Sequence, residues 1–203
     1  MDLEPGIEGE GRDGLNLHPQ QITALEYLRR KGTEAPVPQL YSHVAKTFQD
    51  FEVYLDTVPP ALRAAKPSPQ AWSAHEVVDH LIVSNRPAVE QLRDLVAGKR
   101  PTTPPIAASL QSENPFQRSW DDLVAELREL HRSFLALIEG ADDTRGVKTP
   151  VVMVLRIPDE SGASVPVTWE EDLDWKAYTQ AFRVHTVEHK SQIERTLAAL
   201  AAS

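Results

Sequence analysis

The segment WKAYTQAFRVHTVEHKSQIERTLAAL, residues 175–200, is the most informative about the fold of this chain. Its large apolar residues recur at steps of three and four, at Trp175, Tyr178, Phe182, Ile193, Leu197 and Leu200. This spacing places them on one face of a helix of roughly seven turns. Because a helix with one apolar face must bury that face against other elements, the chain needs packing partners for this helix.

Two histidines complete the apolar stripe of this helix. The positions that continue the stripe between Phe182 and Ile193 are 185 and 189, and both are histidine. At about 100° per residue, His185 and His189 point in the same direction as their apolar neighbours. Two imidazoles one turn apart can bind one metal ion, or each can be an ordinary buried histidine hydrogen-bonded to a neighbour. The spacing alone leaves both interpretations open.

Three other segments have the same one-sided periodicity. Apolar residues recur at steps of three and four over residues 37–58, before Pro59 and Pro60. A second stripe runs from Ser73 to a stop at Gly98, and a third covers residues 115–139 with Phe116 in its inward set. Four such stripes can be buried only against one another, which predicts an all-α fold, an antiparallel four-helix bundle.

The second of these helices has a distinct start signal. Ser73 and Glu76 have the S-x-x-E spacing of a capping box, and Trp72 is placed to pack on Val77. Glu76 also lies one turn before His80, where a general base could act. The capping spacing favours an end-cap for Glu76 over a catalytic role.

Outside these helices the sequence predicts smaller elements. Residues 1–16 combine four glycines with five acids and one arginine, which is typical of a flexible acidic arm before a bundle domain at 17–203. A short helix is expected at 19–31, with Gly32 as its stop. Residues 151–157 and 165–168 predict a small β-hairpin or extended arm between the third and fourth helices, turning at 159–162. The fourth helix should begin between Thr168 and Asp174, and residues 99–114 should form a surface connection.

Composition narrows the classes of function. The net charge of −9 would repel a phosphate backbone, so we expect no nucleic-acid partner. No window approaches the roughly 18–20 apolar residues of a membrane span, and the N-terminus lacks a signal peptide pattern, so we expect a cytoplasmic protein without membrane contact. With no cysteine in the chain, any thiol chemistry needs a thiol from a small molecule.

A metal site built on His185 and His189 needs a third protein ligand. The remaining histidines are His18, His43, His75, His80 and His131. His43 lies well off the stripe of its helix, His75 sits in a first turn and His131 lies on a charged flank, so we expect these three to be solvated. His80 borders the buried stripe beside Leu81 and is the predicted third ligand.

The segment from His185 to His189 also fits the H-x-x-E-H pattern of one class of zinc peptidases. That class takes a third ligand, a glutamate, from well downstream. Only 14 residues follow His189, and the sole later acid, Glu194, is turned away on the same helix. This disfavours the peptidase interpretation and leaves Glu188 as a solvated residue or a partner of His189. Trp175 and Tyr178 are expected in the core, with a pocket lining as the alternative.

The motif Trp72-Ser73-x-x-Glu76-Val77-x-x-His80-Leu81, followed by His185-x-x-x-His189, resembles the DinB-like superfamily of four-helix metalloproteins. The resemblance extends over residues 37–203. It implies a divalent metal ion, often zinc or nickel, held by His80, His185 and His189.

This resemblance also implies classes of reaction. Members include transferases that add low-molecular-weight thiols to electrophiles, glutathione- or mycothiol-dependent isomerases, and proteins described as metal-dependent hydrolases. We therefore expect a small-molecule substrate and an external thiol or water, with the alternative of a non-catalytic metal-binding or ligand-binding stress-associated protein. The sequence leaves open the metal, the catalytic residues, and the choice between a monomer and a homodimer.

Overall fold

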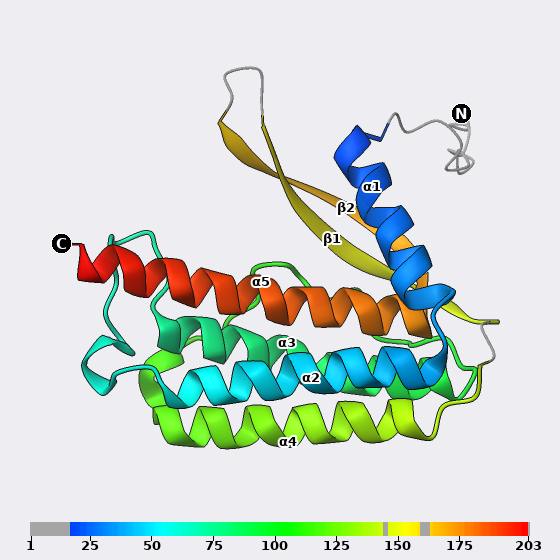
Figure 1. Cartoon of the computed structure of the whole chain (residues 1–203), viewed down its shortest axis with the longest axis horizontal. Coiled ribbons are helices and arrows are strands. Elements are labelled where there is room, and N and C mark those ends of the chain that lie inside the picture. The colour runs from blue at the N-terminus through cyan, green and yellow to red at the C-terminus, as the bar shows by residue number, and fades with distance from the viewer. Residues whose placement is uncertain (1–16, 144–145, 159–162, 203) are drawn as a thin grey trace, which may run out of the picture.

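Four long helices form a bundle in the computed structural model, which describes residues 17–143, 146–158 and 163–202 (Figure 1). These helices are α2 (Val37–Asp56), α3 (Ala74–Val96), α4 (Trp120–Glu139) and α5 (Trp175–Ala201). A short helix, α1 (Pro19–Leu28), and a hairpin of β1 (Lys148–Pro158) and β2 (Ser164–Asp174) are added to the bundle. The predicted all-α four-helix bundle is confirmed, although its neighbouring helices α3 and α4 are parallel rather than antiparallel. The predicted acidic arm at 1–16 and the hairpin turn at 159–162 lie outside the described residues.

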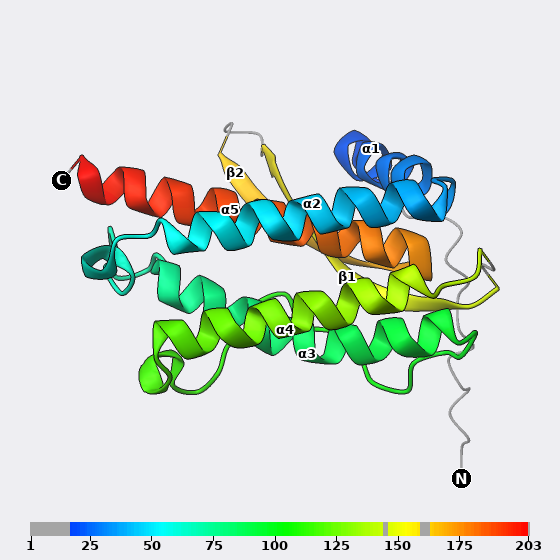
Figure 2. The same cartoon turned by 60° about the horizontal axis from the view of Figure 1, so that its bottom comes forward.

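The helix directions follow from one long connection. Helices α3 and α4 run the same way, and α2 and α5 both run the opposite way (Figures 1 and 2). The segment 97–119, which we name the crossing segment, returns along the bundle between the end of α3 and the start of α4. A non-helical chain can advance about 3.3 Å per residue against about 1.5 Å in a helix, so 23 residues suffice for this return.

Side-chain caps fix where the helices begin. The capping box of Ser73 and Glu76 is present at the start of α3, and α3 ends before Gly98, which has a φ of +69°. Ser119 caps α4, so the predicted start at residue 115 is wrong. Residues 115–117 form a separate short turn in which Phe116 is 49% exposed, because the extended backbone at Arg118 interrupts the helix.

The last helix is likewise capped by a side chain, since the Asp174 carboxylate accepts hydrogen bonds from the backbone N–H groups of Lys176 and Ala177. The alternative start at Thr168 is wrong because Thr168 pairs with Val154 in the hairpin. The two strands are antiparallel over 11 residues each and are longer than the sequence predicts.

The bundle core consists of two apolar clusters. On α5 the first cluster ends at Phe182 and the second includes Ile193. On α3 the second cluster reaches Ile82 and the first begins at Ala88. The two candidate ligands of α5, His185 and His189, therefore lie between two apolar clusters, in surroundings of low polarity.

The π-helical turn that follows α1 packs on α5 through Gly32. The sequence predicts Gly32 as a helix stop, but it lies within a π-helical turn, Arg29–Thr33, and is buried. A Cβ atom at Gly32 would lie 2.7 Å from the Cα of Ala177 and 2.8 Å from the carbonyl oxygen of Lys176. Glycine is needed here for close backbone approach. Of the large apolar residues of α1, Leu28 is buried, whereas Ile22 is 46% exposed.

We expect Gly32→Ala to destabilise the protein. The added methyl group must displace the backbone of α5, and overpacking of this kind costs about 1–3 kcal/mol. For a chain of this size, that corresponds to a fall in Tm of roughly 2–12 °C, measurable by thermal unfolding. Gly140→Ala is the matched control, because the nearest atom to its Cβ would be 3.9 Å away. Equal Tm values for the two variants would show that α1 does not pack against α5 in this way.

Candidate metal centre

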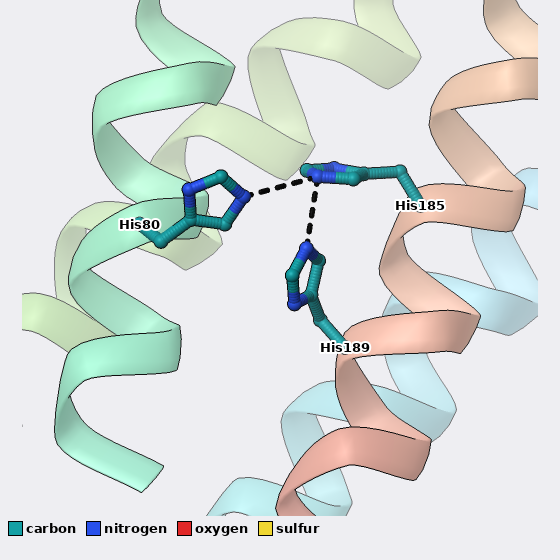
Figure 3. A group of neighbouring side chains, drawn as sticks. All are labelled: His80, His185 and His189. Atoms are coloured by element: carbon teal, nitrogen blue, oxygen red, sulfur yellow. Dashed lines mark hydrogen bonds between the residues drawn. The ribbon is translucent and has the colours of Figure 1, made fainter. Parts of the chain in front are cut away.

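Three histidines from two helices converge between the apolar clusters. His80 extends from α3, and His185 and His189 extend from successive turns of α5 (Figure 3). The Nε2 atom of His185 lies 3.1 Å from Nε2 of His80 and 3.0 Å from Nε2 of His189. All three potential ligand atoms lie within 4.8 Å of one another. The structure thus brings together the three residues that the sequence selected.

The hydrogen bonds of these rings leave their Nε2 atoms as acceptors. His80 Nδ1 lies 2.6 Å from the carbonyl oxygen of Leu110, which can only accept, so Nδ1 of the ring is the donor. His189 Nδ1 lies 2.8 Å from Oε1 of Gln192 and has the same role. In their neutral forms both rings therefore present a lone pair at Nε2, towards the same nitrogen of His185.

One N–H group of His185 cannot donate to both of these lone pairs. At least one of the two short contacts between nitrogens is then unfavourable without a cation between the rings. Two imidazole nitrogens on one tetrahedral Zn²⁺ ion would be separated by about 3.3 Å, given Zn–N bonds of about 2.05 Å. The donor set and its spacing fit a divalent metal ion.

Burial keeps the three imidazoles neutral at pH 7. Burial lowers the pKa of His80, although its bond to Leu110 and the charge of Asp79 act in the opposite direction. Burial and the neighbouring His80 lower the pKa of His189 to about 4. Burial, with the two other rings, holds the pKa of His185 well below its ordinary value. A neutral imidazole is the form that binds a metal.

The acidic residues near these histidines have other partners. The Glu76 carboxylate accepts hydrogen bonds from Ser73 and from Lys66, which confirms its role as an end-cap. Glu188 is exposed, and His189 bonds to Gln192 instead. Within the described residues the cluster consists of histidines alone. The Trp72 ring lies 5.2 Å from the His80 ring and forms an apolar neighbour of the site.

The other histidines have structural surroundings. His43 is exposed as predicted, and His18 caps α1. The prediction that His75 is solvated is wrong, because it is buried beside Trp120 with Nε2 3.0 Å from the carbonyl oxygen of Pro115. His131 is also buried, at 1% exposure.

The burial of His131 follows from the packing of α4 against α2. Its ring stacks on Phe48 with a centroid separation of 3.8 Å, and its Nδ1 atom lies 2.7 Å from Oε1 of Glu52. The charged neighbours of His131 in the sequence hid this contact, because Glu52 is supplied by another helix.

Two predicted core residues behave as expected. Trp175 and Tyr178 are buried, and the Tyr178 hydroxyl donates to Oε1 of Gln91. Burial raises the pKa of Tyr178 above its ordinary value. The sequence did not identify Leu110 or Gln192 as partners of the histidines. Gln192 could have been found from its position three residues after His189, whereas a backbone carbonyl in an irregular segment has no sequence signal.

The sequence model of the DinB superfamily matches residues 43–165 of the chain, which include His80. The chain belongs to the DinB superfamily. His185 and His189 lie outside the matched range, so their part in the DinB site rests on the geometry described above. None of the described DinB helices is long and apolar enough to cross a membrane.

Two solved structures have a similar fold to this DinB chain. One is TT2238, described as a four-helix bundle protein, with 16% identity, a TM-score of 0.50, and coverage of 83% of this chain and all of that chain. The other is YfiT from Bacillus subtilis, described as a probable metal-dependent hydrolase with an unusual four-helix bundle topology. It is 14% identical, with a TM-score of 0.53 and 95% of each chain covered. Among curated proteins, none matches the sequence.

Proposed function

We propose that this DinB protein binds one divalent metal ion through His80, His185 and His189 and uses it to transfer a low-molecular-weight thiol to a small electrophile. The convergence of three neutral imidazoles, within 4.8 Å of one another, carries the proposal. Zinc and nickel both suit such ligands. Bound there, the ion would lower the pKa of a thiol or water beside it and stabilise the resulting anion.

The chain's own residues hold and orient this site. His185 and His189 are fixed by α5, and the Leu110 carbonyl holds His80 with Nε2 towards them. The two apolar clusters on either side limit the access of water from within the bundle. Three neutral ligands leave the full positive charge of the ion to attract an anionic sulfur atom.

The surroundings of the site favour a thiol over water as the nucleophile. A free thiol has a pKa of about 8.5 and free water one of about 15.7, so a much smaller shift by the metal is enough to ionise the thiol at pH 7. The cluster in the described residues contains no carboxylate, and Glu76 and Glu188 are directed elsewhere. The chain has no cysteine of its own to act as the thiol.

Hydrolysis is the second candidate. It is supported by the description of the structural neighbour YfiT as a probable metal-dependent hydrolase, although at 14% identity the likeness concerns the fold. In that case water, in place of the thiol, would be the nucleophile at a metal held by the same three histidines.

The test is a turnover assay on the full-length protein loaded with zinc or nickel. We expect conjugation of a halogenated arene, with loss of halide, or of an epoxide, with opening of one ring C–O bond and protonation of the oxygen, to require both the metal and an added thiol, because each supplies a part that the chain lacks. Removal of the metal with a chelator and omission of the thiol should each abolish the enzyme-dependent rate. The reaction is followed by the loss of free thiol and by mass spectrometry of the adduct.

Other outcomes identify other functions. Ester or amide cleavage with metal present and thiol absent would replace the transferase with the hydrolase. If a broad panel shows neither reaction at full metal occupancy, the protein is a non-catalytic metal-binding protein.

A further inference from the structure

The crossing segment, residues 97–119, is attached to α3 at several levels, and two of these attachments concern the proposed metal site. Towards the end of α3, the side-chain amide of Gln91 donates to Oγ1 of Thr103 at 2.9 Å and to the carbonyl oxygen of Pro104 at 3.0 Å. Gln91 is itself held by the Tyr178 hydroxyl of α5, at 2.9 Å. The segment therefore begins its return along α3 from a fixed, buried point.

The second attachment lies beside the proposed metal ligand. The carbonyl oxygen of Leu110 is 2.6 Å from Nδ1 of His80. This bond determines which ring nitrogen carries the proton and directs the lone pair of Nε2 towards His185 and His189. The position of one backbone carbonyl in an irregular segment thus controls a ligand on a helix.

A buried aspartate fixes that carbonyl. Asp79 precedes His80 on α3 and is 4% exposed. Its Oδ2 accepts from the backbone N–H of Ser112 at 3.0 Å, and the Ser112 hydroxyl lies 2.9 Å from both carboxylate oxygens. The charge of Arg86 acts on Asp79, but across the described residues no lysine or arginine forms an ion pair with it, and its hydrogen bonds come from Ser112.

These contacts are two residues apart on the crossing segment and one residue apart on α3. Leu110 and Ser112 of the crossing segment meet the adjacent residues His80 and Asp79 of α3. Ser112 therefore anchors the chain two residues after Leu110, whose carbonyl oxygen holds His80. A shift of the segment away from Asp79 would move the acceptor of the ligand's N–H group.

We propose that Asp79 and Ser112 are positioning residues for the metal ligand His80, and that the position of the crossing segment is coupled to metal binding. The proposal rests on the proposed metal site. Outer partners of ligating histidines change metal affinity by about 10- to 100-fold when they are removed. The coupling is reciprocal, so a metal at Nε2 should also hold Leu110 and Ser112 more tightly in place.

Zinc affinity of the full-length Ser112→Ala variant tests the positioning role. A competition titration should show zinc binding weakened by about 10-fold, because the hydroxyl bonds to Asp79 are lost while the ligands remain. Ser112→Thr keeps the hydroxyl and should restore the affinity. Ser109→Ala is the matched control in the same segment, since Ser109 is exposed and its side chain makes no hydrogen bond in the described structure.

Two further measurements separate positioning from a general loss of stability. The visible absorption of bound Co²⁺ should change in Ser112→Ala and not in Ser109→Ala, because it reports ligand geometry. Hydrogen exchange over residues 106–113 should slow when zinc is added to the wild type, and slow less in Ser112→Ala. A purely structural role would lower the unfolding temperature and leave zinc affinity, measured far below it, unchanged.

The outcomes distinguish the two proposals. Equal zinc affinity and equal Co²⁺ spectra for wild type, Ser109→Ala and Ser112→Ala would overturn the positioning role and leave the metal site intact. Unchanged hydrogen exchange on adding zinc to the wild type would overturn the coupling. Absence of zinc binding by the wild type would overturn the metal site and the positioning role together.

Discussion

Replacing His189 by alanine should reduce the metal content of the protein from about one divalent ion per chain to background. His189 supplies one of only three converging imidazoles, and its Nε2 atom lies 3.0 Å from that of His185. Two neutral imidazoles cannot hold the ion against dilution and buffer as three can. Elemental analysis of protein purified without a histidine tag measures this content directly.

The control for this experiment is His43→Ala. His43 is exposed on α2, so its loss should leave the metal content unchanged. His131 is a poor control because it is buried and stacked on Phe48, and its replacement would disturb the core. If His189→Ala retained as much metal as the wild type, the assignment of the site would be wrong.

Turnover should fall by at least about 100-fold in His80→Ala. Removal of an outer partner of a ligand already costs about 10- to 100-fold, so removal of the ligand should cost at least the upper figure. His80 is the single contribution of α3 to the cluster, and without it both remaining ligands come from one helix. The thiol conjugation rate at saturating metal and thiol measures the effect.

Circular dichroism and thermal unfolding must show that the His80→Ala protein is folded. We expect this, because the apolar clusters on either side of the site do not include His80. His43→Ala should again match the wild type in rate. A folded His80→Ala protein with wild-type turnover would mean that the reaction takes place elsewhere in the molecule.

Local features of the sequence are sufficient to predict several helices of this protein and two of its candidate metal ligands. The stripe on residues 175–200 required a helix packed on one side, and Ser73 with Glu76 fixed the start of α3. The pair His185 and His189 was visible because two histidines four residues apart share one helix face. Each of these properties depends on residues within a few turns of one another, where helix geometry fixes the relation.

Contacts between distant segments were less accessible from the sequence. His75 and His131 were expected to be solvated, yet the carbonyl of Pro115 and the carboxylate of Glu52 reach them from other parts of the chain. From the sequence, Gly32 is predicted to be a helix stop. Its close approach to Ala177 leaves no local signal, because the two residues are far apart in the chain. Periodicity describes one helix and cannot state which helix lies opposite.

The candidate site likewise has some features that follow from the local sequence and others that depend on contacts between distant segments. The periodicity of the sequence predicts a bundle with two histidines on the inner face of its last helix. His80 follows as the third ligand from its place beside the buried stripe of its own helix, and the family resemblance implies the same residue. The contact of Leu110 with the ring of His80 is visible only in the folded chain, because the crossing segment carries Leu110 back along α3. A helix fixes the directions of its side chains over a few residues, so these directions can be predicted from the sequence. The path of an irregular segment depends instead on the buried groups that need its hydrogen bonds, which here are Asp79 and Gln91.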